Sequence, residues 1–215
     1  MFDANAGNFF KQWMRNPIEA GALSPSSHSL AHAMARLVDD DAYASVLELG
    51  GGTGAITHAL LQNGVSAQRL VVMEKNPSMA DALNQRFSDV RILQQDAARL
   101  WRLGSYKEDA NFTTVISGLP MLLFGKRKQY AILKQAFGLL GTDGAFLQFT
   151  YGLSAPISRR VLKRLGVQAT REAFIWRNAP PASVWRLCLI DQGGAQTDYA
   201  AQRLSTVGFT SQQQM

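Results

Sequence analysis

The sequence contains very little cysteine and no long apolar run. Its single cysteine, Cys188, excludes a disulfide framework within the chain and fits a reducing compartment. No stretch of about 18 uncharged apolar residues occurs, and the N-terminus lacks the apolar core of a signal peptide. We therefore expect a protein that does not span a membrane but is able to lie on one.

Acidic residues are also scarce relative to basic ones. The chain carries 22 Lys and Arg against 16 Asp and Glu, which gives a net charge of +6. This balance favours an anionic partner, such as nucleic acid, a membrane surface or an acidic ligand, although a moderate positive charge also serves solubility alone. With 215 residues, 47% of them hydrophobic, the chain is long enough for one well-buried domain.

Strand-like apolar runs alternate with amphipathic helical patterns along the chain. Strands are predicted at residues 45–49, 69–74, 90–94, 112–117 and 144–151, and helices at 56–62, 77–87, 127–140 and 157–165. Residues 174–190 predict two final strands joined by a turn at Pro180 and Pro181. This alternation indicates an α/β fold in which helices cover both faces of a mostly parallel sheet.

A glycine-rich loop follows the first predicted strand. Gly50, Gly52 and Gly54 alternate between that strand and the next helix, where glycine lets the backbone turn tightly and approach a ligand. Glu74 ends the second strand, where a carboxylate can accept hydrogen bonds from both hydroxyls of a ribose. The pair favours a nucleoside-containing cofactor; the alternative is a tight turn beside a surface glutamate.

The loop has the pattern Glu-x-Gly-x-Gly-x-Gly, which resembles motif one of the class I S-adenosylmethionine-dependent methyltransferases. By that resemblance, Glu48 helps to fix the loop and the methionine end of the cofactor. Asp96, after the third strand, would bond the adenine amine, with Ala97 packed nearby. Asp96 has an alternative role as the cap of the following helix.

The segment SGLPMLLF, residues 117–124, follows the fourth strand, which faces the methyl group in this superfamily. Enzymes that methylate the exocyclic amine of adenine carry Asn or Asp, a proline-containing pair and an aromatic residue there. Here Ser117 stands in place of Asn and Met121 in place of the aromatic ring, so a platform for base stacking is missing. An aliphatic wall favours a lipid-like substrate; the alternative is that Leu122, Leu123 and Phe124 belong to the core.

The N-terminus carries an aromatic and basic helical pattern. Its apolar residues fall on one helical face and its cations on others, as in helices that lie in a membrane interface. The alternative is a helix packed on the domain. The residues concerned are Phe9, Phe10, Lys11, Trp13, Met14 and Arg15.

Several motifs together resemble the bacterial phospholipid N-methyltransferases. They are FFKQWMRNPIEAGALSPSS, ELGGGTG, VVMEKNP, SGLPMLLF, QFTYG and WRNAPPASVWR. The resemblance implies a Rossmann-like three-layer sandwich with a seven-stranded, mostly parallel sheet and one antiparallel strand. It also implies S-adenosylmethionine as methyl donor, S-adenosylhomocysteine as product, no metal, and methylation of phosphatidylethanolamine to its mono-, di- and trimethyl forms.

For this family the expected location is the cytoplasm, in peripheral contact with the anionic cytoplasmic membrane. We expect a helical membrane-contacting segment over residues 1–30, the methyltransferase domain over 31–190 and a flexible tail over 191–215. The oligomeric state is left open.

Candidate catalytic residues cluster after the fourth and fifth strands. We predict that the Ser117 hydroxyl or the Gly118 carbonyl accepts from the substrate amine and that Tyr151 contacts its phosphate or amine. Arg177 and Arg186, placed beside the proline turn, are candidates for binding the lipid phosphate, and so is the pair at 159–160. The alternative for these arginines is a solvated basic face.

Three rival functions remain. An enzyme like the ribosomal RNA adenine dimethyltransferases fits the basic charge and the Leu-Pro pair, but it conflicts with the missing Asn, aromatic ring and further RNA-binding domain, so no nucleic-acid partner is expected. A second possibility is another amino lipid, such as ornithine lipid, as methyl acceptor. A third is a binding protein that retains the cofactor site without catalysis.

Overall fold

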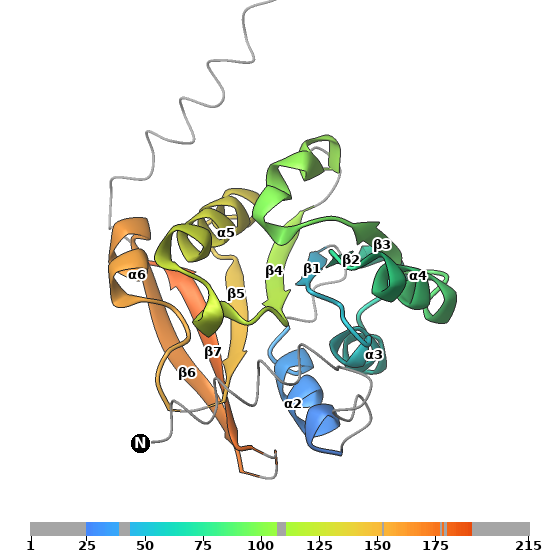
Figure 1. Ribbon diagram of the computed structural model, residues 1–215, viewed down its shortest axis with the longest axis horizontal. Helices are drawn as coiled ribbons and strands as arrows, with labels where there is room; N and C mark the ends of the chain where they lie inside the picture. Colours follow the sequence, from blue (N-terminus) through green and yellow to red (C-terminus); the bar gives the residue numbers. More distant parts are fainter. Residues whose placement is uncertain are drawn as a thin grey trace, which may run out of the picture.

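The computed structural model describes residues 25–38, 44–106, 111–151, 153–176, 178 and 180–190. The predicted interfacial helix with Phe9 to Arg15, Arg177 and the tail from residue 191 lie outside these residues, so their roles stay predictions. Within the described part, one seven-stranded sheet forms the centre of the molecule, with strand order β3-β2-β1-β4-β5-β7-β6 (Figure 1).

The strands follow the predicted apolar runs closely. They are β1 (Ser45–Leu49), β2 (Leu70–Glu74), β3 (Arg91–Gln94), β4 (Phe112–Ser117), β5 (Ala145–Thr150), β6 (Val167–Ile175) and β7 (Ala182–Leu189). All neighbours among β1 to β5 pair in parallel, and β7 pairs antiparallel with both β5 and β6. The sheet therefore confirms the expected Rossmann-like methyltransferase architecture with one antiparallel strand.

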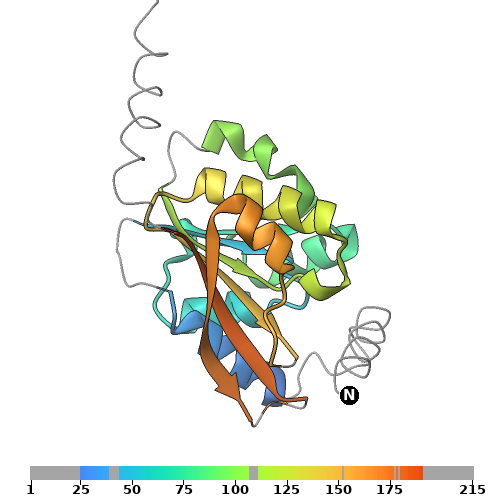
Figure 2. The ribbon, with the colours of Figure 1, turned by 90° about the vertical axis from the view of Figure 1, so that its left-hand side faces the viewer.

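Helices cover both faces of the sheet (Figure 2). The α-helices are α2 (Pro25–Ala35), α3 (Ala55–Gln62), α4 (Pro77–Arg86), α5 (Lys126–Leu139) and α6 (Arg159–Leu165), and the 3-10 helices are η1 (Ala67–Arg69), η2 (Ala97–Tyr106) and η3 (Met121–Leu123). Buried side chains of α2, α3 and α4 pack on one face, and those of α5, α6 and η2 pack on the other. Strands buried on both sides explain why the sequence reads as continuous apolar runs.

Three features differ from the sequence-based expectation. Helix α2 was not distinguished from the N-terminal segment, yet its Leu30 and Met34 are buried in the core, so the helix crosses the expected division at residue 30. Helix η2 was not predicted. Strand β6 begins at Val167, whereas the sequence predicted a start at Phe174. The first half of the strand exposes polar side chains and lacks an apolar run, so it gave no strand signal. The division into segments itself stays a prediction.

Candidate cofactor and active site

The predicted cofactor residues lie at one edge of the sheet. Strand β1 lies between β2 and β4, so the chain order reverses at the boundary between β1 and β4. In parallel α/β sheets, ligands bind outside the carboxyl ends of the strands at such a reversal. The carboxyl ends of β1, β2, β3 and β4 bring the glycine loop, Glu74, Asp96 and Ser117 to this edge.

The glycine loop is held tightly on its protein side. Gly54 has a φ of 81°, which side chains disfavour, and a Cβ there would lie 2.5 Å from Cε2 of Phe87. Both the backbone conformation and the lack of space therefore require glycine at this position. Gly52 also has a positive φ, 53°, but a Cβ there would meet only the Gly50 carbonyl oxygen at 3.9 Å. The loop therefore packs closely on α4 and leaves open space at Gly52, where a ligand can approach the backbone.

Glu74 ties the loop to the start of α4. Its Oε2 accepts a hydrogen bond from the Gly52 amide at 3.0 Å, and its Oε1 accepts one from the Asn76 amide at 2.7 Å. The side chain is buried, which contradicts the alternative of a surface glutamate. Each oxygen retains a second acceptor site, so its contact with the ribose hydroxyls stays a prediction that the geometry permits.

Glu48 lies beneath the loop with its carboxyl group fully buried. Oε2 accepts a hydrogen bond from Thr57 Oγ1 of α3 at 2.7 Å, whereas Oε1 has no hydrogen-bond partner among the described residues. Burial, aided by the nearby Glu74 carboxylate, raises the pKa of Glu48 to about 8. A buried acceptor without a partner fits a ligand that brings a cation or an N–H donor, as the amino acid end of S-adenosylmethionine does.

Asp96 is already engaged within the protein. Oδ1 accepts from the Ala98 amide at 2.9 Å, and Oδ2 lies 2.9 Å from Lys75 Nζ. These contacts, the backbone hydrogen bond first, hold the pKa of Asp96 below its ordinary value. The alternative role as a cap at the start of η2 is thus present, while Ala97 is buried beside it. Bonding of the adenine amine by Asp96 stays a prediction.

The start of the SGLPMLLF segment lies against the glycine loop. The Gly118 amide donates to the Leu49 carbonyl at 2.8 Å, and a Cβ on Gly118 would lie 2.8 Å from the Gly50 carbonyl oxygen. Ser117 is fully buried, and its Oγ accepts from the Leu119 amide at 3.3 Å. The two residues predicted to contact the amine therefore lie next to the cofactor loop, and their contacts with substrate stay predictions.

Two buried glutamines hold the rest of this segment, and the sequence reasoning missed both. Gln148 Nε2 donates to the Leu119 carbonyl at 3.0 Å. Gln129 Nε2 donates to the Met121 carbonyl at 2.8 Å, and its Oε1 accepts from the Ser158 amide at 3.0 Å. For Gln148, the available signal was an amide side chain in the largely apolar strand AFLQFT, because buried polar groups need specific partners.

The apolar half of the segment is divided between the core and the surface. Met121, which stands in the aromatic position, is buried in the cluster beneath α5. The core alternative holds in part for Leu123, which is partly buried against the opposite cluster. Leu122 is 55% exposed. Phe124 is partly buried, with Lys128 Nζ 3.7 Å from its ring centroid. The expected continuous aliphatic wall is therefore a shorter surface around Leu122 and Phe124.

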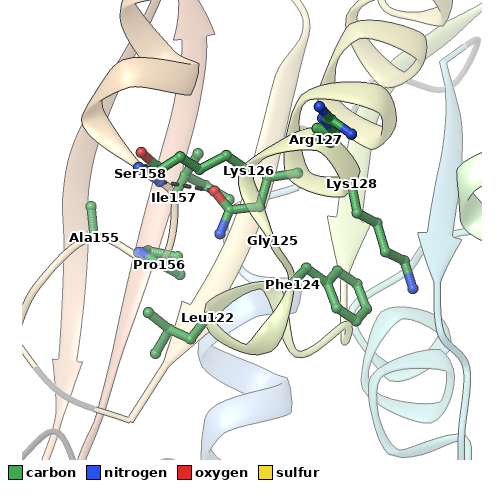
Figure 3. A pocket seen from close by; sticks show the side chains of 11 residues that line it. Leu122, Phe124, Gly125, Lys126, Arg127, Lys128, Ala155, Pro156, Ile157 and Ser158 are labelled. Carbon is green, nitrogen blue, oxygen red and sulfur yellow. Dashed lines mark hydrogen bonds between the residues drawn. The ribbon is translucent and has the colours of Figure 1, made fainter.

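An open pocket of about 780 Å³ begins at this surface (Figure 3). Its walls come from the end of η3, the first turn of α5 and residues 155–158 before α6. Leu122 and Phe124 lie on the η3 side, and Lys126, Arg127 and Lys128 extend from α5. The pocket thus combines an apolar lining with three cations.

The predicted contacts after β5 and on β7 have other partners. Tyr151 is half-buried, its ring meets Phe149 edge-on at 5.5 Å, and burial raises its pKa to about 12. Arg186 lies in mid-strand rather than beside the proline turn, so that expectation of its position is wrong. Its guanidinium contacts Glu172 Oε1 at 3.2 Å and donates to the Leu37 carbonyl at 2.9 Å. Arg186 therefore joins β7 to β6 and to the end of α2.

The described residues contain no cluster of three or more His, Cys, Asp or Glu that could hold a metal ion. In the same part of the chain, no helix combines the length and the apolar character needed to cross a membrane.

Comparison with known proteins identifies a matching family model, described as "Methyltransferase domain", over residues 46–144. The ornithine lipid N-methyltransferase of Singulisphaera acidiphila is 30% identical over 185 residues, which are 83% of this chain and 91% of that relative. The ribosomal RNA small subunit methyltransferase A of Anaeromyxobacter dehalogenans (strain 2CP-C) is 33% identical over 169 residues, or 71% of this chain and 56% of that relative.

Two similar solved structures contain the expected cofactor or its product. Magnesium protoporphyrin IX methyltransferase from Synechocystis PCC 6803, with bound S-adenosylmethionine, has a TM-score of 0.59 at 15% identity, covering 87% of this chain and 94% of that one. The O-methyltransferase from Bacillus cereus, in complex with S-adenosylhomocysteine, has a TM-score of 0.58 at 15% identity, covering 88% and 92%. At these identities the likeness shows the fold.

Proposed function

Because this chain belongs to the class I S-adenosylmethionine-dependent methyltransferases, we propose that it methylates the amine of a membrane lipid headgroup. Phosphatidylethanolamine is the substrate implied by the sequence resemblance, and ornithine lipid is the acceptor named for the similar protein of Singulisphaera acidiphila. Both carry an amine close to an anionic oxygen group, so one site can serve either.

The observation that carries this proposal is the nature of the surface after Ser117. The residue in the aromatic position, Met121, is buried in the core and offers no ring for a purine to stack on. From Leu122 onward the segment forms one side of an apolar pocket that carries three cations. A lipid presents apolar chains and an anionic group together, whereas RNA presents anionic phosphates without apolar chains.

S-adenosylmethionine supplies a methyl group on a positively charged sulfur, which a nitrogen lone pair attacks. The chain's own residues have three tasks in this reaction. The open backbone at Gly52 and the acceptors of Glu74 and Glu48 would hold the nucleoside end and the amino acid end of S-adenosylmethionine. Ser117 Oγ or the Gly118 carbonyl would accept from the substrate amine and direct its lone pair toward the cofactor edge.

The substrate amine must lose a proton before it can act as nucleophile. An alkylammonium has a pKa of about 10.4 in water, like that of Lys, and an apolar surrounding lowers that pKa because desolvation disfavours the charged form. The new C–N bond would replace the C–S bond of the donor, and the proton lost from the ammonium would go to solvent. No step needs a side chain acting as base at neutral pH, and Tyr151, with its pKa near 12, is protonated there.

An RNA-directed function is the second candidate, supported by the similarity to ribosomal RNA small subunit methyltransferase A. One assay distinguishes the two. Labelled S-adenosylmethionine is offered with phosphatidylethanolamine vesicles, ornithine lipid vesicles and ribosomal RNA in separate reactions, with Gly52→Ala as a cofactor-site control. We expect label in lipid, sensitive to the substitution. Label in RNA alone would reverse the proposal.

A further inference from the structure

The pocket after η3 is built, and not merely a gap between surface side chains. Gln129 is buried in its wall and joins the two sides, through the Met121 carbonyl at 2.8 Å and the Ser158 amide at 3.0 Å. Pro156 and Ile157 are buried on the far side, so that side is anchored in the core. The two sides of the pocket are therefore joined through one buried side chain and are anchored in the core.

The charge of the pocket has one sign. Lys126, Arg127 and Lys128 are exposed in the first turn of α5, and the lining contains no Asp or Glu. The Lys128 ammonium lies over the Phe124 ring, and its charge helps to lower the pKa of Asp96. Lys128 is therefore on the side of the predicted cofactor residues. Among the described residues, Lys126 and Arg127 make no such contact.

Three large apolar side chains follow strands at one edge of the sheet and are exposed, and one of them, Leu122, lines the pocket. Leu122, Leu153 and Trp176 follow the carboxyl ends of β4, β5 and β6 and are 55%, 65% and 77% exposed. Since β4, β5 and β6 run in the same direction, the segments that follow these strands begin at the edge that carries the glycine loop. Large apolar side chains exposed at the same edge favour a surface that meets a partner or a membrane.

We propose that this pocket binds the substrate lipid itself. Lys126 and Arg127 hold the anionic group of the headgroup, and the apolar side chains of the lining, which include Leu122 and Ile157, receive the adjoining acyl chain. This inference rests on the proposed function and specifies its substrate as an amine-bearing lipid with an anion a few bonds away. Because η3 follows Ser117 and Gly118 closely in the chain, the proposal places the amine on the side of these two residues. The arginines expected to bind phosphate, at 159–160 and at 186, do not line this pocket.

The test compares two double variants with the same loss of charge. Lys126→Gln with Arg127→Gln removes the two pocket cations, and Lys134→Gln with Lys163→Gln removes two exposed cations outside the lining. Lipid methylation is measured over a range of substrate concentrations, and sedimentation is measured with phosphatidylglycerol vesicles. Titration of S-adenosylmethionine reports whether each variant still folds and binds the cofactor.

We expect the pocket variant to raise KM for lipid about 30-fold with kcat little changed, at about 1 kcal/mol for each cation near an anionic lipid. The control pair should change KM no more than about twofold. Leu122→Ser should raise KM for long-chain lipid and leave that for water-soluble glycerophosphoethanolamine unchanged. Phosphatidylethanolamine and ornithine lipid, assayed in parallel, distinguish a phosphate from a carboxylate as the bound anion.

Equal KM values for the pocket pair and the control pair would overturn the site while leaving lipid methylation in place. An effect of the charge variant with none from Leu122→Ser would also overturn it, because the pocket would then bind an anion without a chain. If the wild-type protein labels no lipid but the pocket variant alone loses vesicle binding, the proposed function fails and the lipid pocket stands.

Discussion

The buried carboxyl group of Glu48 makes a quantitative prediction about stability. In the unfolded chain its pKa is 4.5, and in the folded protein burial raises the pKa to about 8. Folding therefore favours the protonated form, so unfolding releases a proton between these two pH values. The stabilising contribution is fully present below pH 4.5, falls as the pH rises to about 8 and stays constant above that. At 1.36 kcal/mol for each pH unit, the loss is about 5 kcal/mol.

The substitution Glu48→Gln removes this titration and keeps the shape of the side chain. Its amide oxygen can still accept the hydrogen bond from Thr57 Oγ1. We expect the free energy of unfolding of the variant, relative to wild type, to rise by several kcal/mol from pH 5 to pH 9. Urea unfolding followed by circular dichroism measures both proteins at each pH. Glu172→Gln, at a carboxylate paired with Arg186, controls for the change in net charge.

A second measurement connects this titration to the cofactor. If the free Oε1 of Glu48 meets a cationic end of S-adenosylmethionine, binding lowers the pKa of Glu48 and releases about one proton at pH 7. Titration calorimetry in two buffers of different ionisation enthalpy counts that proton, and Glu48→Gln should release none. Parallel stability curves for wild type and Glu48→Gln between pH 5 and 9 would refute the assignment of a buried, protonated carboxyl group.

Three further predictions concern the loop and the active edge. Gly52→Ala and Gly64→Ala both place a side chain at a positive φ with open space, so each should cost about 1–2 kcal/mol of stability. Only Gly52→Ala should weaken cofactor binding, measured by calorimetry. Equal affinities of the two variants would place the cofactor elsewhere. Gln148→Leu frees the Leu119 carbonyl and should lower kcat about tenfold at unchanged cofactor affinity, measured by steady-state kinetics; unaltered kcat would make the hydrogen bond irrelevant to positioning. Tyr151→Phe should leave the shape of the pH–rate profile between pH 7 and 10 unchanged, because the wild-type hydroxyl is protonated throughout; a lost titration there would contradict its raised pKa.

The sequence predicted the fold well because its strands are buried on both faces. Strand β1 was expected at residues 45–49 and lies at Ser45–Leu49, and the glycine loop follows it as expected. Prediction was weaker where burial is one-sided or supplied by distant elements. Strand β6 has a half-exposed pattern that is typical of neither a strand nor a helix. Helix α2 is buried because it packs on α3 and the last two strands, which lie far away in the sequence.

The site shows the same division. Gly52, Gly54 and Glu74 were identified from spacing, and Ser117 from its place after the fourth strand and the superfamily resemblance. Residues at or just after the ends of parallel strands lie at the carboxyl edge of the sheet. Their partners were not identified. The amides that Glu74 accepts from, the unpartnered oxygen of Glu48 and the glutamines that hold residues 119 and 121 depend on contacts between distant parts of the chain.

The amino-acid order by itself determined the alternation of strands and helices and the chemistry at the end of each strand, because both follow from local periodicity and from residue type. Only the tertiary structure decided that Met121 packs in the core while Leu122 faces solvent, and that three consecutive cations of α5 border an apolar pocket. Burial and electrostatic environment are sums over neighbours from many segments, and those neighbours are defined only when the sheet has assembled and its helices have packed.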